Sequence, residues 1–224
     1  MCGIFCSIND NSVDLKKINN LQKHRGPDYH GVYKDDFISL AHQRLSIIDT
    51  NQRSNQPLIK KNLIIVFNGE IYNFLELKNK LIKNNKSVKF ITNSDTEVIL
   101  EYFKLYQEKC LDYFQGMFSF IIYDIKSKQT FVARDHFGIK PLYYTKINNS
   151  LYFSSELKTL LKILPHKFDL DYEVIGQFLF QGLTNYSSNS ILKNIKQVKP
   201  GHNYIFKLNK SYIEVDKVRF WNPN

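Results

Sequence analysis

The segment Gly116–Asp124 constrains the fold of this chain more than any other part of the sequence. Read as a strand, it places Ile121 and Tyr123 on one face and Phe118 and Phe120 on the other, so both faces are apolar. A strand of this kind must be covered on both sides. The segment therefore predicts a sheet enclosed between further layers. Because 43% of the 224 residues are hydrophobic, an intrinsically disordered protein is excluded.

The other predicted elements are grouped and do not alternate as βαβ units. Strands are expected at Gly3–Ile8, 31–33, 37–41, Asn62–Phe67, Thr130–Arg134, Leu142–Lys146, Leu151–Ser154 and 203–214, with a turn near Asn209 and Lys210. Helices are expected at 13–23, after Tyr72, after Ser94, at 156–162 and at 171–180. Ser94 followed by Glu97 has the spacing of a capping box. This order favours a layered α+β domain.

Charge and cysteine content exclude several classes of protein. The net charge is +10, but the lysines are scattered along the chain, which favours a solvated surface over a nucleic-acid interface. No apolar run reaches the ~18 residues of a membrane helix, and the first ten residues lack the features of a secretory signal. Three cysteines without CxxC spacing argue against a disulfide scaffold and favour a cytoplasmic setting. The six histidines lack metal-ligand spacing, so we expect no metal.

Cys2 is the first candidate for chemistry. If Met1 is removed, a thiol of pKa ~8.5 and an α-amine of pKa ~7.7–8.0 belong to one residue. The amine can then accept the thiol proton and later return it to a leaving group, so no histidine is required. The alternative is an inert cysteine in a strand, which is our interpretation of Cys6.

Four other residues could complete a site around such a nucleophile. Asn68 and Gly69 could donate a side-chain amide and a backbone N–H to an oxyanion, although Asn-Gly is also a common turn. Arg44 could hold a carboxylate, or form a surface salt bridge. Asp95 could bind an ammonium group, or only stabilise the first turn of its helix, and Glu70 could assist it. Together these groups suit a free α-amino acid that carries a side-chain amide.

Eight motifs occur in order along nearly the whole chain. They are MCGIF at the start, HRGPD (His24–Asp28), HQRLSIID (His42–Asp49), NGEIYN (Asn68–Asn73), SDTE (Ser94–Glu97), GMFSFIIYD (Gly116–Asp124), ARDHFGIKPLYY (Ala133–Tyr144) and SSELK (Ser154–Lys158). In this respect the chain resembles the glutaminase domain of glutamine-hydrolysing asparagine synthetases. These are class II glutamine amidotransferases of the N-terminal-nucleophile hydrolase superfamily.

The resemblance implies a fold and a set of roles. The fold would be a four-layer α/β/β/α sandwich, with Cys2 as the nucleophile and its amine as the base. Asn68 and Gly69 would form the oxyanion hole. Glu70 and Asp95 would bind the α-ammonium of glutamine, and the segment from Arg44 to Ile48 would bind the rest of its head group, with Arg44 on the α-carboxylate. The residues of that segment are Arg44, Leu45, Ser46, Ile47 and Ile48. Glutamine hydrolysis would need no cofactor.

The resemblance also leaves alternatives open. The amidotransferase domain would span residues 2–218, and 219–224 would begin a linker to a synthetase domain that uses ATP and magnesium. No Ser-Gly-Gly-x-Asp-Ser loop of such a domain occurs here, so the chain is either part of a longer enzyme or a separate subunit, and a homodimer is possible. The ammonia could instead pass to a sugar or polysaccharide precursor. A catalytically silent binding module is a third reading.

Overall fold

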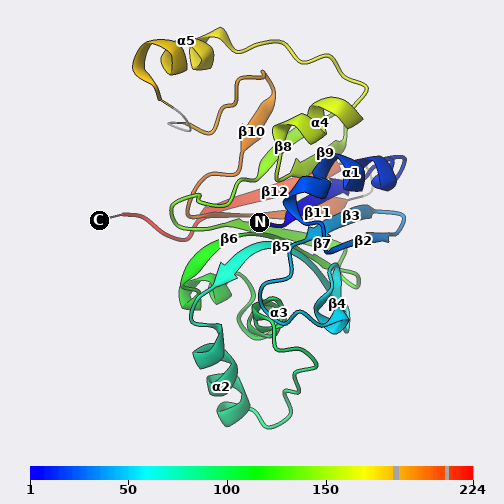
Figure 1. The fold of residues 1–224 in the computed structure, drawn as a ribbon, viewed down its shortest axis with the longest axis vertical. Coiled ribbons are helices and arrows are strands. Elements are labelled where there is room, and N and C mark those ends of the chain that lie inside the picture. The colour runs from blue at the N-terminus through cyan, green and yellow to red at the C-terminus, as the bar shows by residue number, and fades with distance from the viewer. Residues whose placement is uncertain (184–186, 210–211, 224) are drawn as a thin grey trace.

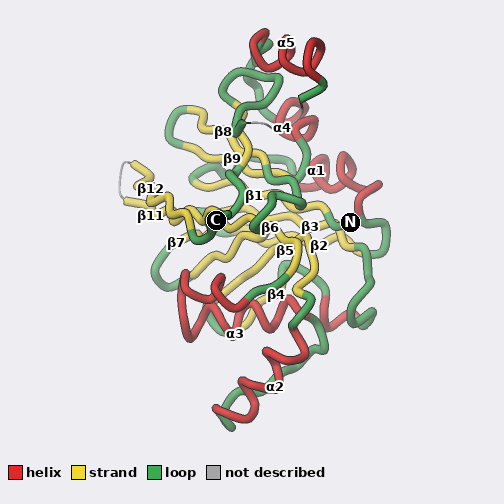
Figure 2. The backbone as a smooth tube through the Cα atoms, turned by 90° about the vertical axis from the view of Figure 1, so that its left-hand side faces the viewer, coloured by secondary structure: helices red, strands yellow, loops and turns green. Residues whose placement is uncertain are grey.

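The computed structural model describes residues 1–183, 187–209 and 212–223, and it confirms the four-layer α/β/β/α sandwich (Figures 1 and 2). Two six-stranded antiparallel sheets pack face to face. Sheet A has the order β10-β8-β9-β1-β3-β2 and sheet B the order β12-β11-β7-β6-β5-β4. Helices cover the outer face of each sheet. The nucleophile candidate lies next to β1, a central strand of sheet A.

The strand bounds agree with most of the predicted segments. Sheet A consists of β1 (Gly3–Ile8), β2 (Tyr29–Lys34), β3 (Ile38–Arg44), β8 (Tyr143–Ile147), β9 (Ser150–Ser154) and β10 (Ile195–Gln197). Sheet B consists of β4 (Leu58–Lys60), β5 (Leu63–Ile71), β6 (Gly116–Asp124), β7 (Gln129–Arg134), β11 (His202–Asn209) and β12 (Tyr212–Arg219). The turn expected near Asn209 and Lys210 includes Lys210, which lies outside the described residues.

The helices occupy the two outer layers. Helices α1 (Leu15–Gln22) and α4 (Leu157–Ile163) lie on sheet A, and α2 (Phe74–Asn84) and α3 (Asp95–Tyr106) lie on the sheet B side (Figure 2). Helix α5 (Tyr172–Gln181) stands apart at the top of Figure 1 and buries none of its residues. In the described part of the chain, 3₁₀ helices also occur at Lys23–Arg25, Gln52–Ser54 and Gln107–Tyr113.

Strand β6 has the two apolar faces that the sequence predicts. Ile121 and Tyr123 pack into the core between the sheets. Phe118, Phe120 and Ile122 pack into the core between sheet B and its helices. A third core, which includes Phe5 and Ile18, lies between sheet A and its own helices. These three apolar interfaces define the four layers and hold both sheets in a fixed relation.

Strand β5 is longer than the sequence indicates. It does not end at Phe67 but continues through Asn68 to Ile71, because its pairing with β6 continues as far as Ile71 opposite Gly116. The turn expected as an alternative at Asn68-Gly69 is therefore wrong. At Gly69 a Cβ would lie 2.2 Å from the carbonyl oxygen of Met117, so only glycine lets the strands approach this closely.

The start of α3 is confirmed, but its capping differs from the expected box. Ser94 is the N-cap residue and its side chain makes no capping hydrogen bond. The Glu97 carboxylate turns to the preceding loop and accepts the N–H groups of Thr92 (2.7 Å) and Ile91 (3.0 Å). It also forms an ion pair with Lys60 on β4. Glu97 therefore fixes the loop that leads into Asp95, the first residue of the helix.

Candidate functional site

Cys2 lies immediately before β1 and lines a cavity of about 150 Å³, together with residues of both sheets and of the start of α3. Its Sγ accepts the backbone N–H of Leu45 at 3.4 Å and lies 3.8 Å from the Leu45 carbonyl oxygen. The pairing of Gly3 with Gln43 brings Cys2 to the end of β3, where Arg44 and Leu45 follow. Cys6 lies four residues farther along the chain, on β1, and is completely buried in the core. Cys110 is buried as well, so Cys2 is the one cysteine of the three that a substrate can reach.

Arg25 holds the backbone of Cys2, a role that the sequence analysis did not assign. Its Nε–H donates to the Cys2 carbonyl at 2.9 Å, and its Nη1 donates to Glu156 at 3.2 Å. Glu156 also lies 2.6 Å from Nε2 of His24. Arg25 and Glu156 belong to the motifs HRGPD and SSELK, and that membership was the available signal.

The surroundings of Cys2 favour the protonated form of its thiol, so that a base is needed to form the thiolate. Burial raises the pKa of the Cys2 thiol, although the Leu45 N–H, the amino terminus and Arg44 act in the opposite direction. The thiol is therefore protonated near neutral pH and must lose a proton before it can attack. Burial also lowers the pKa of the terminal amine of Met1, which lines the same cavity. An amine in this place has an increased neutral fraction and is able to accept a proton.

Asn68 offers an unused hydrogen-bonding group to the cavity. Its side chain is fully buried, and neither its Oδ1 nor its Nδ2 has a partner among the described residues. A buried amide without a partner costs about 1–3 kcal/mol unless a ligand or water satisfies it. Asn68 and Gly69 line the cavity together with Cys2. This arrangement suits a donor pair for an oxyanion.

Two carboxylates line the same cavity. Asp95 is 4% exposed, and its Oδ2 accepts the Ile71 N–H at 3.0 Å. Burial, with a smaller contribution from the nearby charge of Glu70, raises the pKa of Asp95 to about 6, although hydrogen bonds from the backbone act in the opposite direction. Asp95 and Glu70 both line the cavity. A cation bound between the two carboxylates would offset the free-energy penalty of burying the Asp95 charge.

Arg44 lines the cavity, but it also organises the loop that follows it. Its Nη1 donates to the carbonyl of Asn51 (3.1 Å) and to Oδ1 of Asn55 (2.7 Å), and its Nη2 donates to the carbonyls of Ile48 and Asp49. Leu45, Ile47 and Ile48 line the cavity as well. Ser46 does not line it, because its N–H turns to Asp28 at 2.7 Å.

Lys140 lines the cavity, and the sequence analysis did not single it out, although it belongs to the motif ARDHFGIKPLYY. Asp135 accepts its N–H at 3.0 Å, and Arg134 donates to its carbonyl at 2.8 Å. Burial and the nearby Arg25 lower the pKa of Lys140, while the charges of Asp135, Cys2 and Glu70 oppose this change. Lys140 is thus a partly desolvated cation whose charge interacts with Cys2.

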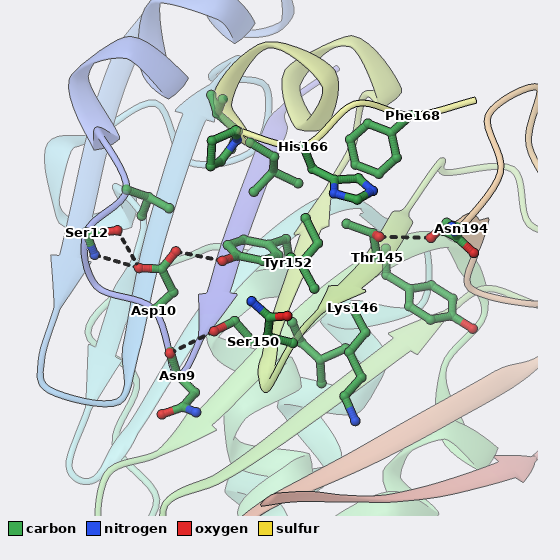
Figure 3. A pocket seen from close by; sticks show the side chains of 18 of the residues that line it. Asn9, Asp10, Ser12, Thr145, Lys146, Ser150, Tyr152, His166, Phe168 and Asn194 are labelled. Atoms are coloured by element: carbon green, nitrogen blue, oxygen red, sulfur yellow. Dashed lines mark hydrogen bonds between the residues drawn. The ribbon is translucent and has the colours of Figure 1, made fainter. Parts of the chain in front are cut away.

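A larger cavity, of about 1200 Å³, lies beyond the C-terminal end of β1, where the loop after Ile8 and the strands β8 and β9 line it (Figure 3). Many of its polar side chains are already paired. Asp10 accepts from Tyr152 (2.7 Å) and Ser12, and Thr145 donates to the carbonyl of Asn194 at 2.8 Å. It contains no cysteine, whereas the smaller cavity combines a thiol with an unpartnered amide. The smaller cavity is therefore the candidate active site.

Among residues 1–183, 187–209 and 212–223, no three or more histidine, cysteine, aspartate or glutamate side chains are grouped as a metal site would require. Among the same residues, no helix combines the length and the apolar character needed to cross a bilayer.

Comparison with known proteins identifies close relatives in sequence. The family described as "Glutamine amidotransferase domain" matches residues 1–221. The chain is 37% identical over 218 residues to asparagine synthetase [glutamine-hydrolyzing] 1 of Bacillus subtilis, a match that covers 92% of this chain and 34% of that protein. It is 42% identical over 176 residues to asparagine synthetase B of Escherichia coli, covering 73% of this chain and 30% of that protein. The chain thus spans about a third of the length of these relatives.

Solved structures show the same fold at lower sequence identity. The glutamine phosphoribosylpyrophosphate amidotransferase of Bacillus subtilis superposes with a TM-score of 0.68 and is 19% identical. The superposition covers 98% of this chain and 49% of that one. This likeness establishes the fold alone.

Proposed function

This chain belongs to the glutamine amidotransferase domain family, and we propose that it hydrolyses glutamine to glutamate and ammonia with Cys2 as the nucleophile. The observation that carries the proposal is the fully buried Asn68 amide, which has no partner among the described residues and shares a cavity with the only accessible thiol. Removal of Met1 would give Cys2 a free amine, as the mechanism requires.

The reaction would proceed through a thioester. The amine of Cys2 takes the thiol proton, and Sγ attacks the side-chain amide carbon of glutamine. The oxyanion that forms accepts hydrogen bonds from the Asn68 amide and the Gly69 N–H. The C–N bond then breaks, and the amine returns its proton to the departing ammonia. Water hydrolyses the γ-glutamyl thioester and frees the thiol.

The head group of glutamine would lie between charges of opposite sign. Asp95 and Glu70 would receive its α-ammonium, and Arg44 would receive its α-carboxylate. The four N–H groups of Arg44 on Nη1 and Nη2 bind its own loop, so its direct contact with substrate requires either Nε or an exchange of partners. Leu45, Ile47 and Ile48 would close the apolar side of the pocket, and the Ser46 N–H would hold the loop through Asp28.

The ammonia would serve asparagine synthesis from aspartate and ATP. Several curated relatives, from Bacillus subtilis to Escherichia coli, are named glutamine-hydrolysing asparagine synthetases, and each is longer than this chain. ATP and magnesium would therefore act in a synthetase domain or partner that receives ammonia, and a homodimer stays part of the proposal. The free thiols suit a cytoplasmic protein. A sugar or polysaccharide precursor as acceptor has no specific support.

The proposal is tested by following glutamate release from glutamine together with the intact mass of the protein. We expect loss of Met1, and no turnover in Cys2→Ala. Cys6→Ala is the matched control, because its thiol is buried in the core and should leave turnover in place. Asn68→Ala should lower kcat by about 10²–10³. Turnover by Cys2→Ala at the wild-type rate would refute the assignment.

A further inference from the structure

Two buried polar side chains, His42 and Gln56, have no part in the mechanism above. Both are directed at one residue, Phe67, which immediately precedes the oxyanion donors Asn68 and Gly69. His42 Nε2 lies 3.0 Å from the Phe67 carbonyl oxygen. The Oε1 of Gln56 accepts the Phe67 N–H at 2.7 Å.

Phe67 needs these partners because a neighbouring strand is missing. On one edge β5 pairs with β6 along its whole length. On the other edge β4 pairs only as far as Leu58 opposite Ile65. Continuing that register would put Gln56 opposite Phe67, where the Gln56 side chain replaces the backbone of a strand. Buried backbone groups require partners, and these two side chains supply them.

His42 reaches Phe67 from the opposite sheet. It lies on β3 of sheet A, paired with Ile4 and Gly31, and is completely buried. Because a carbonyl oxygen only accepts, Nε2 must carry the hydrogen of this bond. Burial lowers the pKa of His42 to about 4, so the ring is neutral above pH 5. His42 thus links β3, which leads to Arg44, to the strand that carries Asn68.

Asn68 depends on this support. Its side chain has no hydrogen-bond partner among the described residues, so no side-chain bond holds its orientation. That orientation then follows from the backbone at residues 67 and 68. Gln56 lines the cavity too, and its Nε2 donates to Thr96 at 3.3 Å, next to Asp95. It therefore connects the oxyanion segment with the start of α3.

We propose that His42 and Gln56 are positioning residues, which hold both backbone polar groups of Phe67 and so aim Asn68 and Gly69 at the oxyanion. The inference rests on the proposed glutamine hydrolysis. Misplacement of a catalytic group by ~1 Å can cost about 10²-fold in rate. The loss should affect the transition state more than glutamine binding, because the oxyanion forms only after attack.

The test compares kcat and KM for glutamine with the inhibition constant of glutamate γ-semialdehyde, an aldehyde that adds to a thiol and leaves a tetrahedral oxygen. His42→Leu and Gln56→Leu remove one partner of Phe67 each. We expect kcat to fall about 10- to 100-fold, the aldehyde inhibition constant to rise by a similar factor, and KM to stay within about threefold. His42→Gln, which can place an N–H near the same oxygen, should recover part of the loss.

Thr145→Val is the matched control, because the buried Thr145 side chain donates a hydrogen bond (2.8 Å to the Asn194 carbonyl) and lines the larger cavity, not the one that contains Cys2. It should leave all three constants unchanged. Folding is followed by thermal unfolding of each variant. If His42→Leu does not fold, Gln56→Leu tests the other backbone group of Phe67, and failure of both to fold would assign these residues a structural role and overturn the proposal.

The proposal would also be overturned if the folded variants had the wild-type kcat and the wild-type inhibition constant for the aldehyde. The same holds if kcat and KM changed by equal factors while the inhibition constant stayed unchanged. The proposed function is judged separately, by turnover of the wild-type chain and its loss in Cys2→Ala. A wild-type chain without glutaminase activity would refute that function. Active wild-type protein with unaffected variants would refute only the positioning role.

Discussion

Replacing Asp95 by asparagine is expected to stabilise the free protein near neutral pH while weakening the binding of glutamine. Asp95 is 4% exposed, and burial raises its pKa from 3.8 in the unfolded chain to about 6. Between these two values the folded protein holds a proton that the unfolded chain has released. Stability is therefore lost as the pH rises from 4 through 6 and stays low above it.

The magnitude follows from the two pKa values. Each pH unit between them corresponds to ~1.4 kcal/mol, so the buried charge costs about 3 kcal/mol at pH 7.5 and about 1 kcal/mol at pH 4.5. Asparagine has the same size, carries no charge and can still accept the Ile71 N–H. Asp95→Asn should thus exceed the wild type in free energy of unfolding by about these amounts.

Urea unfolding at pH 4.5 and 7.5 measures the difference, and steady-state kinetics measures KM. The matched control is Asp124→Asn. Burial alone would raise the pKa of Asp124, but hydrogen bonds from Asn62 (2.6 Å) and the Lys126 N–H (2.9 Å) outweigh it and lower the pKa. This control should lose stability near pH 7.5. An Asp95→Asn protein without a pH-dependent gain would refute the buried-charge argument. A gain with unchanged KM would refute the ammonium role.

Three further outcomes are expected. Arg44→Ala should raise KM for glutamine more than it lowers kcat, because it removes a cation and frees the loop up to Asn55; an unchanged KM in steady-state kinetics would contradict this. Lys140→Gln should raise the pKa of the Cys2 thiol, because a nearby positive charge favours the thiolate; the pH profile of alkylation by iodoacetamide should then shift to higher pH, and an unmoved profile would count against it. Phe120→Ala should destabilise the protein by about 3–5 kcal/mol, because the ring is fully buried between sheet B and its helices; a loss below about 1 kcal/mol in urea unfolding would be inconsistent with that packing.

Much of the fold could be predicted from local pattern. The two apolar faces of Gly116–Asp124 predicted a covered strand, and β6 packs against both neighbouring layers. The strand Gly3–Ile8 and the helix after Ser94 also have the expected bounds. Such elements are predictable because the side-chain period along a strand or helix depends on neighbouring residues alone. The family could likewise be inferred from motifs in a fixed order.

The extent of β5 and the hydrogen-bond partners of the site residues depended on tertiary contacts. Asn68 belongs to a strand because β6 pairs with it, although the local Asn-Gly pair favours a turn. Arg25 reaches the Cys2 carbonyl, and His42 crosses from one sheet to the other. The local sequence gives the residue types, but hydrogen-bond partners and burial arise only when distant segments pack together. The sequence alone thus determined the nucleophile candidate and the layers. The tertiary structure decided which buried polar groups are paired and which are left for a ligand, because desolvation is a property of the packed molecule.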